Sequence, residues 1–387
     1  MMTLKLVSIV GARPQFIKVA PLVRSFEQLT RERGRPVDHI IIHAGQHYDP
    51  GMSEVFFDEL AIPPAAINLG VGSGSHGVQT GQMLARIEDA LVNSRPDLVV
   101  TYGDTNSALA ATLSAAKLHI PVAHVEAGLR SFNRKMPEEI NRIVADHVSD
   151  LLLAPTPTAI ANLDTEGLGK RAILTGDIMY DAVLFNRRLA AQRSRILERL
   201  ALEPRRYGVV TIHRAANTDD ETRLGMALSA LDEIAATAVP LVFPLHPRTA
   251  KVLRSRFPTW SPHPRLQLIP PIGYLDTLSL VGHARMLLTD SGGLQKEAFF
   301  LGCPCITLRD ETEWVETLHG GGNILTGVDP EAIRAAVSTW DARCPEGRGD
   351  FSAAVAASFG DGHAADRIRD AVLAFVVPRE SAAHAVP

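Results

Sequence analysis

Three features are scarce in this 387-residue sequence: cysteine, an excess of one charge, and long hydrophobic runs. The three cysteines are too few for a disulfide framework and form no CxxC metal-binding pair, which is typical of a reducing compartment. The 39 lysines and arginines are balanced by 43 acidic residues, which excludes the basic field of proteins that bind nucleic acid non-specifically.

No apolar run approaches the roughly 20 residues that span a bilayer, and the apolar start of the chain passes directly into GARPQF. We therefore expect neither a signal peptide nor a membrane anchor. Together these absences predict a cytoplasmic enzyme whose partners include neither nucleic acid nor a membrane.

The chain is long enough for two or three domains of about 150 residues, and short β-branched apolar runs alternate with helical patterns along most of it. This alternation predicts an α/β fold in which helices cover both faces of parallel sheets. Strands are expected at residues 4–10, 39–43, 98–102, 122–125, 151–153 and 172–174, and then at 207–212, 241–243, 266–269, 286–288, 305–308 and 323–325.

A charged, arginine-rich helical stretch at residues 186–206 separates these two groups of strands and has no strand character. We therefore expect two domains of similar size that face each other, one formed by residues 1–190 and the other by residues 191–363. The residues after Val377 contain turn formers without periodicity, which predicts a frayed end.

Chemically reactive residues follow many of the predicted strands. Ligands of open parallel sheets bind outside the carboxyl ends of the strands, so these segments are candidate site segments. Turns are rich in Gly, Asp and Asn in any protein, and turn formation explains one such segment alone. Seven together, carrying carboxylates, imidazoles and guanidinium groups, indicate a catalytic site. They are GARP at Gly11, HAGQH at His43, GDTN at Gly103, EAGLR at Glu126, HR at His213, HPR at His246 and DSGG at Asp290.

One of these segments, Asp290-Ser291-Gly292-Gly293, follows the apolar MLLT run and opens a helical pattern. Free backbone N–H groups and the positive end of a helix favour phosphate binding there, and Glu297 is placed to reach ribose hydroxyls. A plain tight turn is the alternative. Arg13 and Lys18 flank the start of another helix, where they either neutralise a diphosphate or are ordinary surface cations.

Three carboxylates are candidates for proton transfer. Asp104 and Glu126 each end a predicted strand, so both are expected in the same cleft, where like charge and partial burial would raise one pKa. Glu138 follows Pro137, which suits the first position of a helix continuing through Ile140 and Val144 on its apolar face. A surface salt bridge from Glu138 to Arg142, four residues later, explains that glutamate equally well.

Histidines and glycines give two weaker signals. His213 is either a proton carrier or phosphate ligand, or a structural residue at a strand end. The fourteen histidines form no HxH or HExxH pair, so we predict no protein-held metal. The segment from Gly72 to Gly77 matches GxGxxG but does not follow a strong strand, so we expect a loop before a helix at residues 78–91 rather than a dinucleotide site.

The motifs GARPQFIK, YGDTNS, HVEAGLRS, MPEEINR, GDIMYDA, IHRAAN and TDSGGLQKEA occur in this order between Gly11 and roughly Gly327. In their order and spacing the chain resembles the non-hydrolysing UDP-N-acetylglucosamine (UDP-GlcNAc) 2-epimerases. The resemblance implies two Rossmann-like, doubly wound domains facing a cleft, as in the glycosyltransferase-B type, with UDP in the cleft. It also implies a C-terminal helix at about 364–375 crossing back to the first domain, a homodimer, a role in polysaccharide biosynthesis, and neither NAD nor a metal as cofactor.

The implied reaction interconverts UDP-GlcNAc and UDP-N-acetylmannosamine (UDP-ManNAc), an isomerisation. UDP is eliminated anti across C1 and C2, giving a 2-acetamidoglucal, and adds back after reprotonation on the opposite face. The weakly acidic C2 proton requires a carboxylate base, and the departing diphosphate requires preorganised positive charge. Position by position, the resemblance gives Asp104, Glu126 and Glu138 as the acid/base set and His213 as a pyrophosphate-binding or supporting residue. The expected substrate-binding residues are Arg13, Lys18, Gln46, Arg142, Ile272, Thr277, Ser291, Gly292, Gly293 and Glu297, with uracil near Ile272 to Thr277.

The sequence also departs from the family pattern. Ala215 stands where many members have a second arginine, and Trp314 replaces an arginine near the nucleotide. Of the second-substrate, activating site of some bacterial members only Gln46-His47 matches, while Ser75-His76 stands where Arg-Gln is expected. Several motifs are closer to the branch that epimerises UDP-2,3-diacetamido-2,3-dideoxyglucuronate. That substrate, a UDP-sugar glycosyltransferase activity and a non-catalytic UDP-sugar sensor are the alternatives.

Overall fold

The computed structural model describes residues 3–34, 36–45, 60 and 63–383. The chain divides into two compact units, which are described separately. Unit 1 contains Met1–Ala182 and Ser358–Pro387, and unit 2 contains Val183–Ala357. The boundary lies within helix α7 (Ile178–Arg193), a few residues before the stretch in which the sequence places it.

Unit 1 is built on a seven-stranded sheet in which neighbouring strands are all parallel. Its strand order is β3-β2-β1-β4-β5-β6-β7. The strands are β1 (Leu4–Val10), β2 (Val37–His43), β3 (Ile67–Asn68), β4 (Leu98–Tyr102), β5 (Val122–Val125), β6 (Leu151–Ala154) and β7 (Ala172–Leu174). The central strands are apolar on both faces, as expected for strands covered by helices on both sides.

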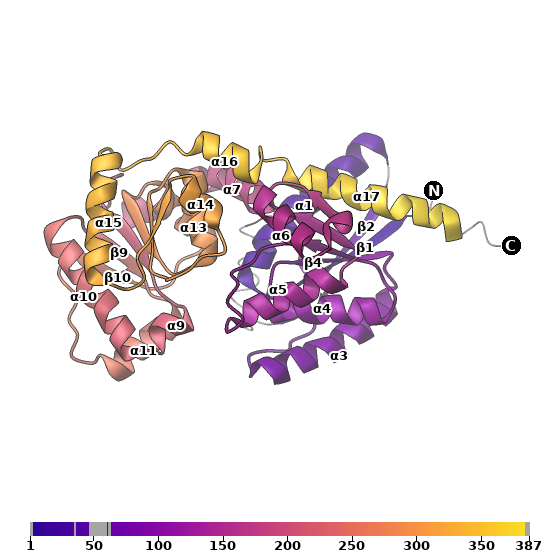
Figure 1. Cartoon of the computed structure of the whole chain (residues 1–387), viewed down its shortest axis with the longest axis horizontal. Coiled ribbons are helices and arrows are strands. Elements are labelled where there is room, and N and C mark those ends of the chain that lie inside the picture. The colour runs from indigo at the N-terminus through magenta and orange to yellow at the C-terminus, as the bar shows by residue number, and fades with distance from the viewer. Residues whose placement is uncertain (1–2, 35, 46–59, 61–62, 384–387) are drawn as a thin grey trace. The chain divides into compact units, whose positions relative to one another are not determined.

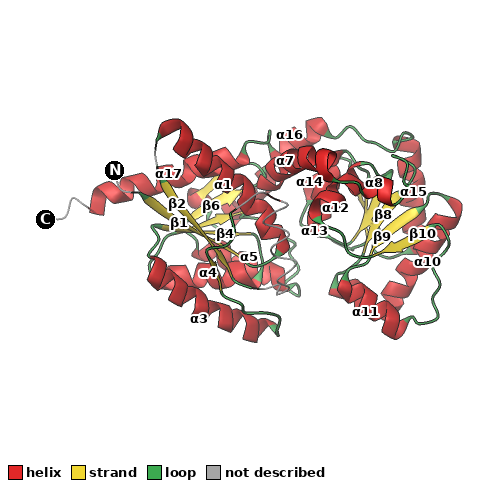
Figure 2. Ribbon diagram, turned by 180° about the vertical axis from the view of Figure 1, so that it is seen from behind, coloured by secondary structure: helices red, strands yellow, loops and turns green. Residues whose placement is uncertain are grey.

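Helices cover both faces of this sheet (Figure 2). They are α1 (Arg13–Arg33), α3 (His76–Ser94), α4 (Asn106–Lys117), α5 (Pro137–Val148), α6 (Pro157–Thr165) and α17 (Ala364–Ala383), with a 3-10 turn at Gly169–Arg171. Met83 and Ile87 of α3 and Ala111 of α4 pack against Val7 and Val99 of the sheet to form a core. Helix α17 lies along α1 (Figure 1), where Ser25 Oγ donates a hydrogen bond of 2.6 Å to Asp366.

Unit 2 repeats the same plan with a six-stranded parallel sheet of order β10-β9-β8-β11-β12-β13. Its strands are β8 (Gly208–Thr211), β9 (Leu241–Pro244), β10 (Leu266–Ile269), β11 (Met286–Thr289), β12 (Cys305–Thr307) and β13 (Asn323–Leu325). Its helices are α8 (Ile196–Arg199), α9 (Ala215–Thr218), α10 (Glu221–Thr237), α11 (Pro247–Arg256), α12 (Tyr274–Gly282), α13 (Gly292–Leu301), α14 (Val315–His319), α15 (Pro330–Arg343) and α16 (Ser352–Phe359).

The direction of winding reverses once in each sheet. In unit 1 the strands run outward from β1 through β2 to β3 on one side, and from β4 onward on the other. In unit 2 the equivalent reversal lies between β8 and β11. Doubly wound sheets bind ligands at this switch point, outside the carboxyl ends of the strands. The predicted fold class, α/β with two Rossmann-like doubly wound domains, is confirmed.

All twelve predicted strands are present, with ends that differ by up to two residues. The short strand β3 was not predicted because two residues carry no periodic pattern. The frayed end predicted after Val377 is wrong, since α17 continues to Ala383. Among the described helices, none is long and apolar enough to cross a membrane.

Candidate active site

Asp104 and Glu126 follow β4 and β5, two neighbouring strands of the unit 1 sheet. Both turns bend sharply: Gly103 has a φ of 65° and Glu126 a φ of 72°. A Cβ on Gly103 would lie 3.0 Å from Glu126 Oε2 and 3.1 Å from Lys18 Nζ. Glycine at position 103 therefore leaves the space in which the Glu126 side chain and Lys18 meet.

Each of these two carboxylates is paired with a cation from a different helix. Lys18 of α1 forms an ion pair with Glu126, and only 10% and 7% of the two side chains are exposed. Arg142 of α5 forms an ion pair with Asp104. These cations oppose the like-charge repulsion that the sequence alone predicts between Asp104 and Glu126.

Helix α5 presents polar residues to the protein interior. Glu139 is 1% exposed and accepts hydrogen bonds from the backbone N–H groups of Ser131 (2.9 Å) and Phe132 (3.0 Å). Arg142 Nη1 also donates to Glu139, at 2.9 Å. The expected apolar face is wrong at Ile140, which is 46% exposed.

Arg142 thus bridges Asp104 and Glu139, so it is not simply the partner of Glu138 in a surface salt bridge. Glu138 itself is half-buried in the first turn of α5. The sequence did contain a signal for this arrangement. Polar residues recur at helical spacing along α5, at Glu139, Arg142 and Asp146, and all three are buried.

Gln15 joins the loop after β1 to the end of β4, a role that the sequence did not reveal. Its Oε1 accepts hydrogen bonds from the N–H groups of Gly11 (2.7 Å) and Ala12 (3.0 Å) and from Ser107 Oγ (2.9 Å). Its Nε2 donates to the carbonyl of Tyr102 at 2.8 Å. The GARP segment and the GDTN segment are therefore fixed to each other.

A buried ion cluster lies beneath the two turns. His124 Nδ1 lies 2.7 Å from Asp146 Oδ1, and Arg130 Nη1 donates to Asp146 Oδ2 at 2.7 Å. Burial alone would raise the pKa of Asp146, but the hydrogen bonds and charges of His124 and Arg130 outweigh it, and the pKa is lowered. Asp146 is therefore held as a carboxylate.

In unit 2, Asp290 follows β11 and braces the turn after β8. It is fully buried and accepts hydrogen bonds from the N–H groups of His213 (3.0 Å) and Arg214 (2.9 Å) and from Asn217 Nδ2 (3.2 Å). The His213 ring is one-third exposed, and its centroid lies 5.2 Å from that of His246. The two imidazoles therefore lie next to each other, one after β8 and the other after β9.

The predicted anion-binding turn opens helix α13. Ser291 is its N-cap, but its side chain makes no capping hydrogen bond, so it does not occupy the backbone N–H groups of the first turn. A Cβ on Gly292 would collide with the Glu313 carboxylate, whereas no atom lies within 4 Å of one on Gly293. Glu297 is buried on the same helix. Lys296 Nζ lies 3.5 Å from the centroid of the Trp314 ring, so Trp314 makes a cation–π contact with a lysine of its own unit.

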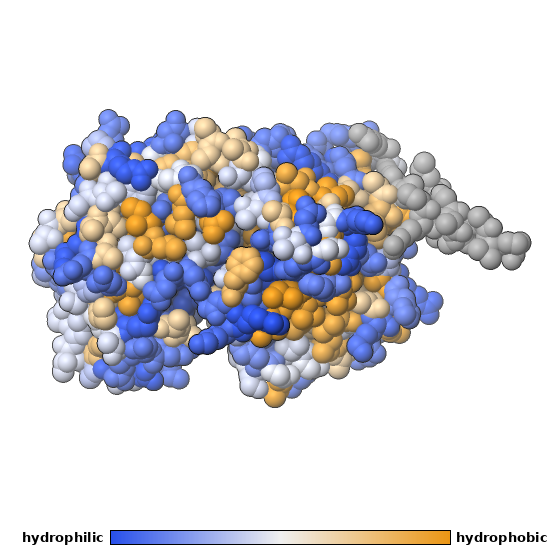
Figure 3. All heavy atoms as spheres, in the orientation of Figure 1, coloured by the Kyte–Doolittle hydropathy of each residue, from blue (hydrophilic) through white to orange (hydrophobic). Residues whose placement is uncertain are grey.

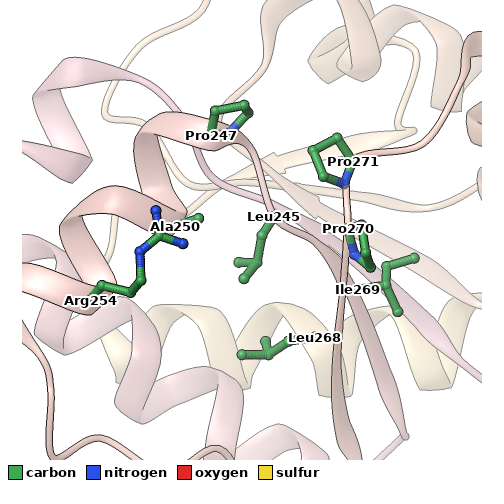
Figure 4. A pocket seen from close by; sticks show the side chains of 8 residues that line it. All are labelled: Leu245, Pro247, Ala250, Arg254, Leu268, Ile269, Pro270 and Pro271. Carbon is green, nitrogen blue, oxygen red and sulfur yellow. The ribbon is translucent and has the colours of Figure 1, made fainter.

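A pocket of about 480 Å³ lies at the carboxyl ends of β9 and β10 (Figure 4). Its lining is mostly apolar, with Arg254 from α11 the one charged side chain in it: Leu245, Pro247, Ala250, Arg254, Leu268, Ile269, Pro270 and Pro271. Pro271 directly precedes Ile272, where uracil is expected. Thr277 Oγ1 donates to the carbonyl of Gly273 at 2.8 Å in the first turn of α12.

Unit 1 brings Lys18 to Glu126 and Arg142 to Asp104, with Glu138 on the helix that carries Arg142. The unit 2 candidates are placed along its own strand ends: His213, Ile272, Thr277, Ser291, Gly292, Gly293 and Glu297. Gln46 and the side chain of Arg13 lie outside the described residues. Within the described part of the chain, no group of three or more His, Cys, Asp or Glu side chains is arranged to hold a metal ion.

The sequence of the chain is similar to that of one family of proteins. Residues 29–373 match the family described as UDP-N-acetylglucosamine 2-epimerase. A UDP-N-acetylglucosamine 2-epimerase homolog of Methanococcus maripaludis is 48% identical over 87% of this chain and 93% of its own length. The UDP-2,3-diacetamido-2,3-dideoxy-D-glucuronate 2-epimerase of Pseudomonas aeruginosa is 44% identical over 95% of this chain and 99% of its own.

Among solved structures, the UDP-GlcNAc 2-epimerase of Methanocaldococcus jannaschii, in complex with UDP-GlcNAc and UDP, superposes with a TM-score of 0.86. It is 40% identical to this chain, and the match covers 96% of this chain and 100% of that one. The chain therefore belongs to the UDP-N-acetylglucosamine 2-epimerase family.

Proposed function

We propose that this protein is a non-hydrolysing UDP-GlcNAc 2-epimerase, an isomerase that interconverts UDP-GlcNAc and UDP-ManNAc. The observation that carries the proposal is the pair of carboxylates at neighbouring strand ends, Asp104 and Glu126, each held by its own cation. Family membership and the relatives named above support the same reaction.

The reaction needs a base for the C2 proton and an acid on the opposite face of the sugar. In the first step a carboxylate takes the C2 proton, the C2 electron pair forms the C1–C2 double bond, and the C1–O bond breaks with its electrons on UDP. In the second step a proton is delivered to C2 from the other face, while a diphosphate oxygen of UDP bonds to C1. Asp104, Glu126 and Glu138 are the proposed acid/base set, because inversion requires proton-transfer groups on both faces.

The unit 2 residues are proposed to bind the nucleotide part of the substrate. The uncapped first turn of α13, at Ser291, Gly292 and Gly293, suits a phosphate because its N–H groups and the helix dipole both favour negative charge. Glu297 is proposed to contact the ribose, His213 the diphosphate, and Ile272 to Thr277 the uracil. From unit 1, Arg13, Lys18 and Arg142 are the proposed cations around the diphosphate and the acids, and Gln46 completes the substrate-binding set.

An exchange experiment tests the proposal. The protein is incubated with UDP-GlcNAc in D2O, and the sugar is followed by NMR. We expect deuterium at C2 together with formation of UDP-ManNAc, because C2 must take its new proton from solvent. Unlabelled UDP-GlcNAc, or release of free ManNAc and UDP, would contradict it. Asp104→Asn is the negative control and should lower exchange by about 100-fold or more.

A second substrate is favoured by one specific observation. The relative from Pseudomonas aeruginosa that is named for the diacetamido-glucuronate matches over 99% of its own length. Running the exchange assay on both UDP-sugars decides between them, since the better substrate will have the larger kcat/KM. If the uronate is labelled faster, the uronate and not UDP-GlcNAc is the substrate, and the reaction is still a 2-epimerisation.

We further propose a homodimer that works in the cytoplasm and supplies nucleotide sugar for polysaccharide biosynthesis. Large hydrophobic side chains are exposed on unit 1, at Val78, Val92, Phe132 and Ile140, and Figure 3 shows hydrophobic residues gathered on one face of this unit. Covering such residues is a common reason for association. Light scattering that gives the mass of a monomer, 41.8 kDa, at micromolar concentration would contradict the dimer. Cell fractionation tests the location.

A further inference from the structure

We propose that His124 is a positioning residue that, together with Asp146, holds the turns carrying Asp104 and Glu126 in one fixed arrangement. The proposal deepens the proposed epimerase function and depends on it for its kinetic test. His124 lies on β5, two residues before Glu126, and is completely buried. It is not among the residues proposed to touch the substrate.

The first contact of His124 fixes the turn that precedes Asp104. Its Nε2 lies 2.7 Å from the carbonyl oxygen of Gly103. A carbonyl accepts but cannot donate, so this nitrogen carries a proton. The backbone of Gly103 is in the left-handed region, and the hydrogen bond from His124 to its carbonyl stabilises this conformation.

The second contact reaches the other turn through Asp146. His124 Nδ1 lies 2.7 Å from Asp146 Oδ1, and Asp146 Oδ2 accepts a hydrogen bond from the N–H of Gly128 at 3.0 Å. Gly128 is two residues after Glu126. One imidazole and one carboxylate therefore tie the backbone before Asp104 to the backbone after Glu126.

The conformation of Glu126 explains why such a brace is needed. A φ of 72° is uncommon for a residue with a side chain, and it persists only where the surroundings over-determine it. Backbone hydrogen bonds from Glu126 and Ala127 to the carbonyl of Leu153 hold the turn on the side of β6. The link from Gly128 to Asp146 holds its far end.

The charges of the cluster fit this role. Both ring nitrogens of His124 face oxygen acceptors, Asp146 Oδ1 and the Gly103 carbonyl, so neither is left unpaired in the interior. Arg130 supplies a second positive charge and pairs with Asp146 and, through two contacts of 2.7 Å, with Glu166. His147, about half exposed, also lies 3.8 Å from Glu166. Asp146 thus contacts His124, Arg130 and the backbone N–H of Gly128, and these several hydrogen bonds hold it in one place.

The kinetic test compares two substitutions at one position. His124→Leu fills the space without a donor, whereas His124→Gln can still donate to the Gly103 carbonyl. We expect His124→Leu to lower kcat by about 10-fold or more with KM changed less than about 3-fold, because misplaced acid/base groups affect the transition state more than binding. His124→Gln should recover most of the loss. A matched control is Asp150→Ala, which removes a hydrogen bond to Val122 at the opposite end of β5.

Three results would overturn the proposal: parental kcat in folded His124→Leu, a His124→Gln variant as slow as His124→Leu, or an equal loss of kcat in Asp150→Ala.

A readout independent of activity is hydrogen–deuterium exchange of the backbone. In His124→Leu and Asp146→Asn, peptides covering residues 101–108 and 124–130 should exchange faster than in the parent, while those of unit 2 keep the parental rate. Unchanged exchange at both turns overturns the positioning role even if the parent proves inactive on every UDP-sugar, and an inactive parent with faster exchange refutes only the proposed function.

Discussion

Lys18 and Glu126 are 108 positions apart in the chain, yet they form an ion pair beside the carboxyl end of β5 in unit 1. The lysine comes from the second turn of α1 and the glutamate from the turn after β5. Both side chains are nearly buried and poorly solvated. Removing one partner would therefore leave an unpaired buried charge, which strongly destabilises the fold. This pair makes stability and the proposed chemistry depend on the same two residues.

Replacing Lys18 by Met should therefore have two separable effects. Removing one partner of a buried pair is expected to lower the free energy of unfolding by about 3 kcal/mol, and losing a preorganised cation should lower kcat by about 100-fold. Urea unfolding and the exchange assay measure the two. The double variant K18M/E126Q should regain much of the stability without regaining activity. A K18M protein that is less stable but fully active would make the lysine a structural residue only.

Gly103→Ala should damage the site more than the fold. Alanine at a positive φ costs about 1–2 kcal/mol anywhere, but here its Cβ also lies 3.0 Å from Glu126 and 3.1 Å from Lys18. We expect a loss of activity of about 10-fold or more from displacement of these groups.

The matched control is Gly34→Ala, at the end of α1, where φ is 62° and no atom lies within 4 Å of the place that a Cβ would occupy. Thermal unfolding should give similar destabilisation for both variants, while the exchange assay should separate them. Equal activity in the two variants would show that the Gly103 turn tolerates a side chain beside Glu126.

Replacing either of the adjacent glutamates of α5 by glutamine should affect a different property: activity for Glu138 and stability for Glu139. Glu138→Gln is expected to change the free energy of unfolding by less than about 0.5 kcal/mol and to lower exchange by about 100-fold. Glu139→Gln removes the buried negative charge beside Arg142 and should cost about 3 kcal/mol. Measuring unfolding and exchange on both proteins tests the assignment, which fails if Glu138→Gln retains parental exchange.

Asp181 predicts a specific dependence of stability on pH. It accepts hydrogen bonds from the N–H groups of Ala364 and Ala365, and burial raises its pKa from 3.8 to about 6. The folded chain holds this proton more tightly than the unfolded chain, so the stabilising contribution is complete below about pH 4 and is lost as pH rises through about 6.

Relative to Asp181→Asn, the parent should lose about 2 kcal/mol of unfolding free energy between pH 4.5 and 7.5. Urea unfolding of both proteins at the two pH values gives this difference directly. If the free energy of unfolding changes equally with pH in the parent and in the variant, the Asp181 carboxyl keeps its ordinary pKa in the folded protein.

Strands were the part of the structure best predicted from sequence, because each parallel strand is a short run of β-branched and other apolar residues such as LKLVSIV. The predicted phosphate-binding and acid segments could also be located from sequence, because the residues of a turn directly follow the strand that precedes it. The pairing of charges was not predictable in this way. Nothing in the local pattern of α1 indicates that Lys18 meets Glu126, because that contact depends on the pairing of β1 with β4 and of β4 with β5 in the finished sheet.

Helix α5 shows a second limit. An apolar stripe usually marks the buried side of a helix, and on that basis Ile140 should be inside. Instead the buried side carries Glu139, Arg142 and Asp146, because Asp104, His124 and Arg130 supply hydrogen bonds and opposite charges from elsewhere in the chain. Charge compensation between distant segments overrides the hydrophobic pattern here.

The return of the last helix to unit 1 has a consequence for synthesis on the ribosome. Ser25 of α1 and Asp181 are translated before unit 2, but their partners Asp366 and Ala364 to Ala365 are translated after it. Unit 2 is contiguous, so every residue it needs has been translated before α17 exists. The domain begun first is therefore the one completed last.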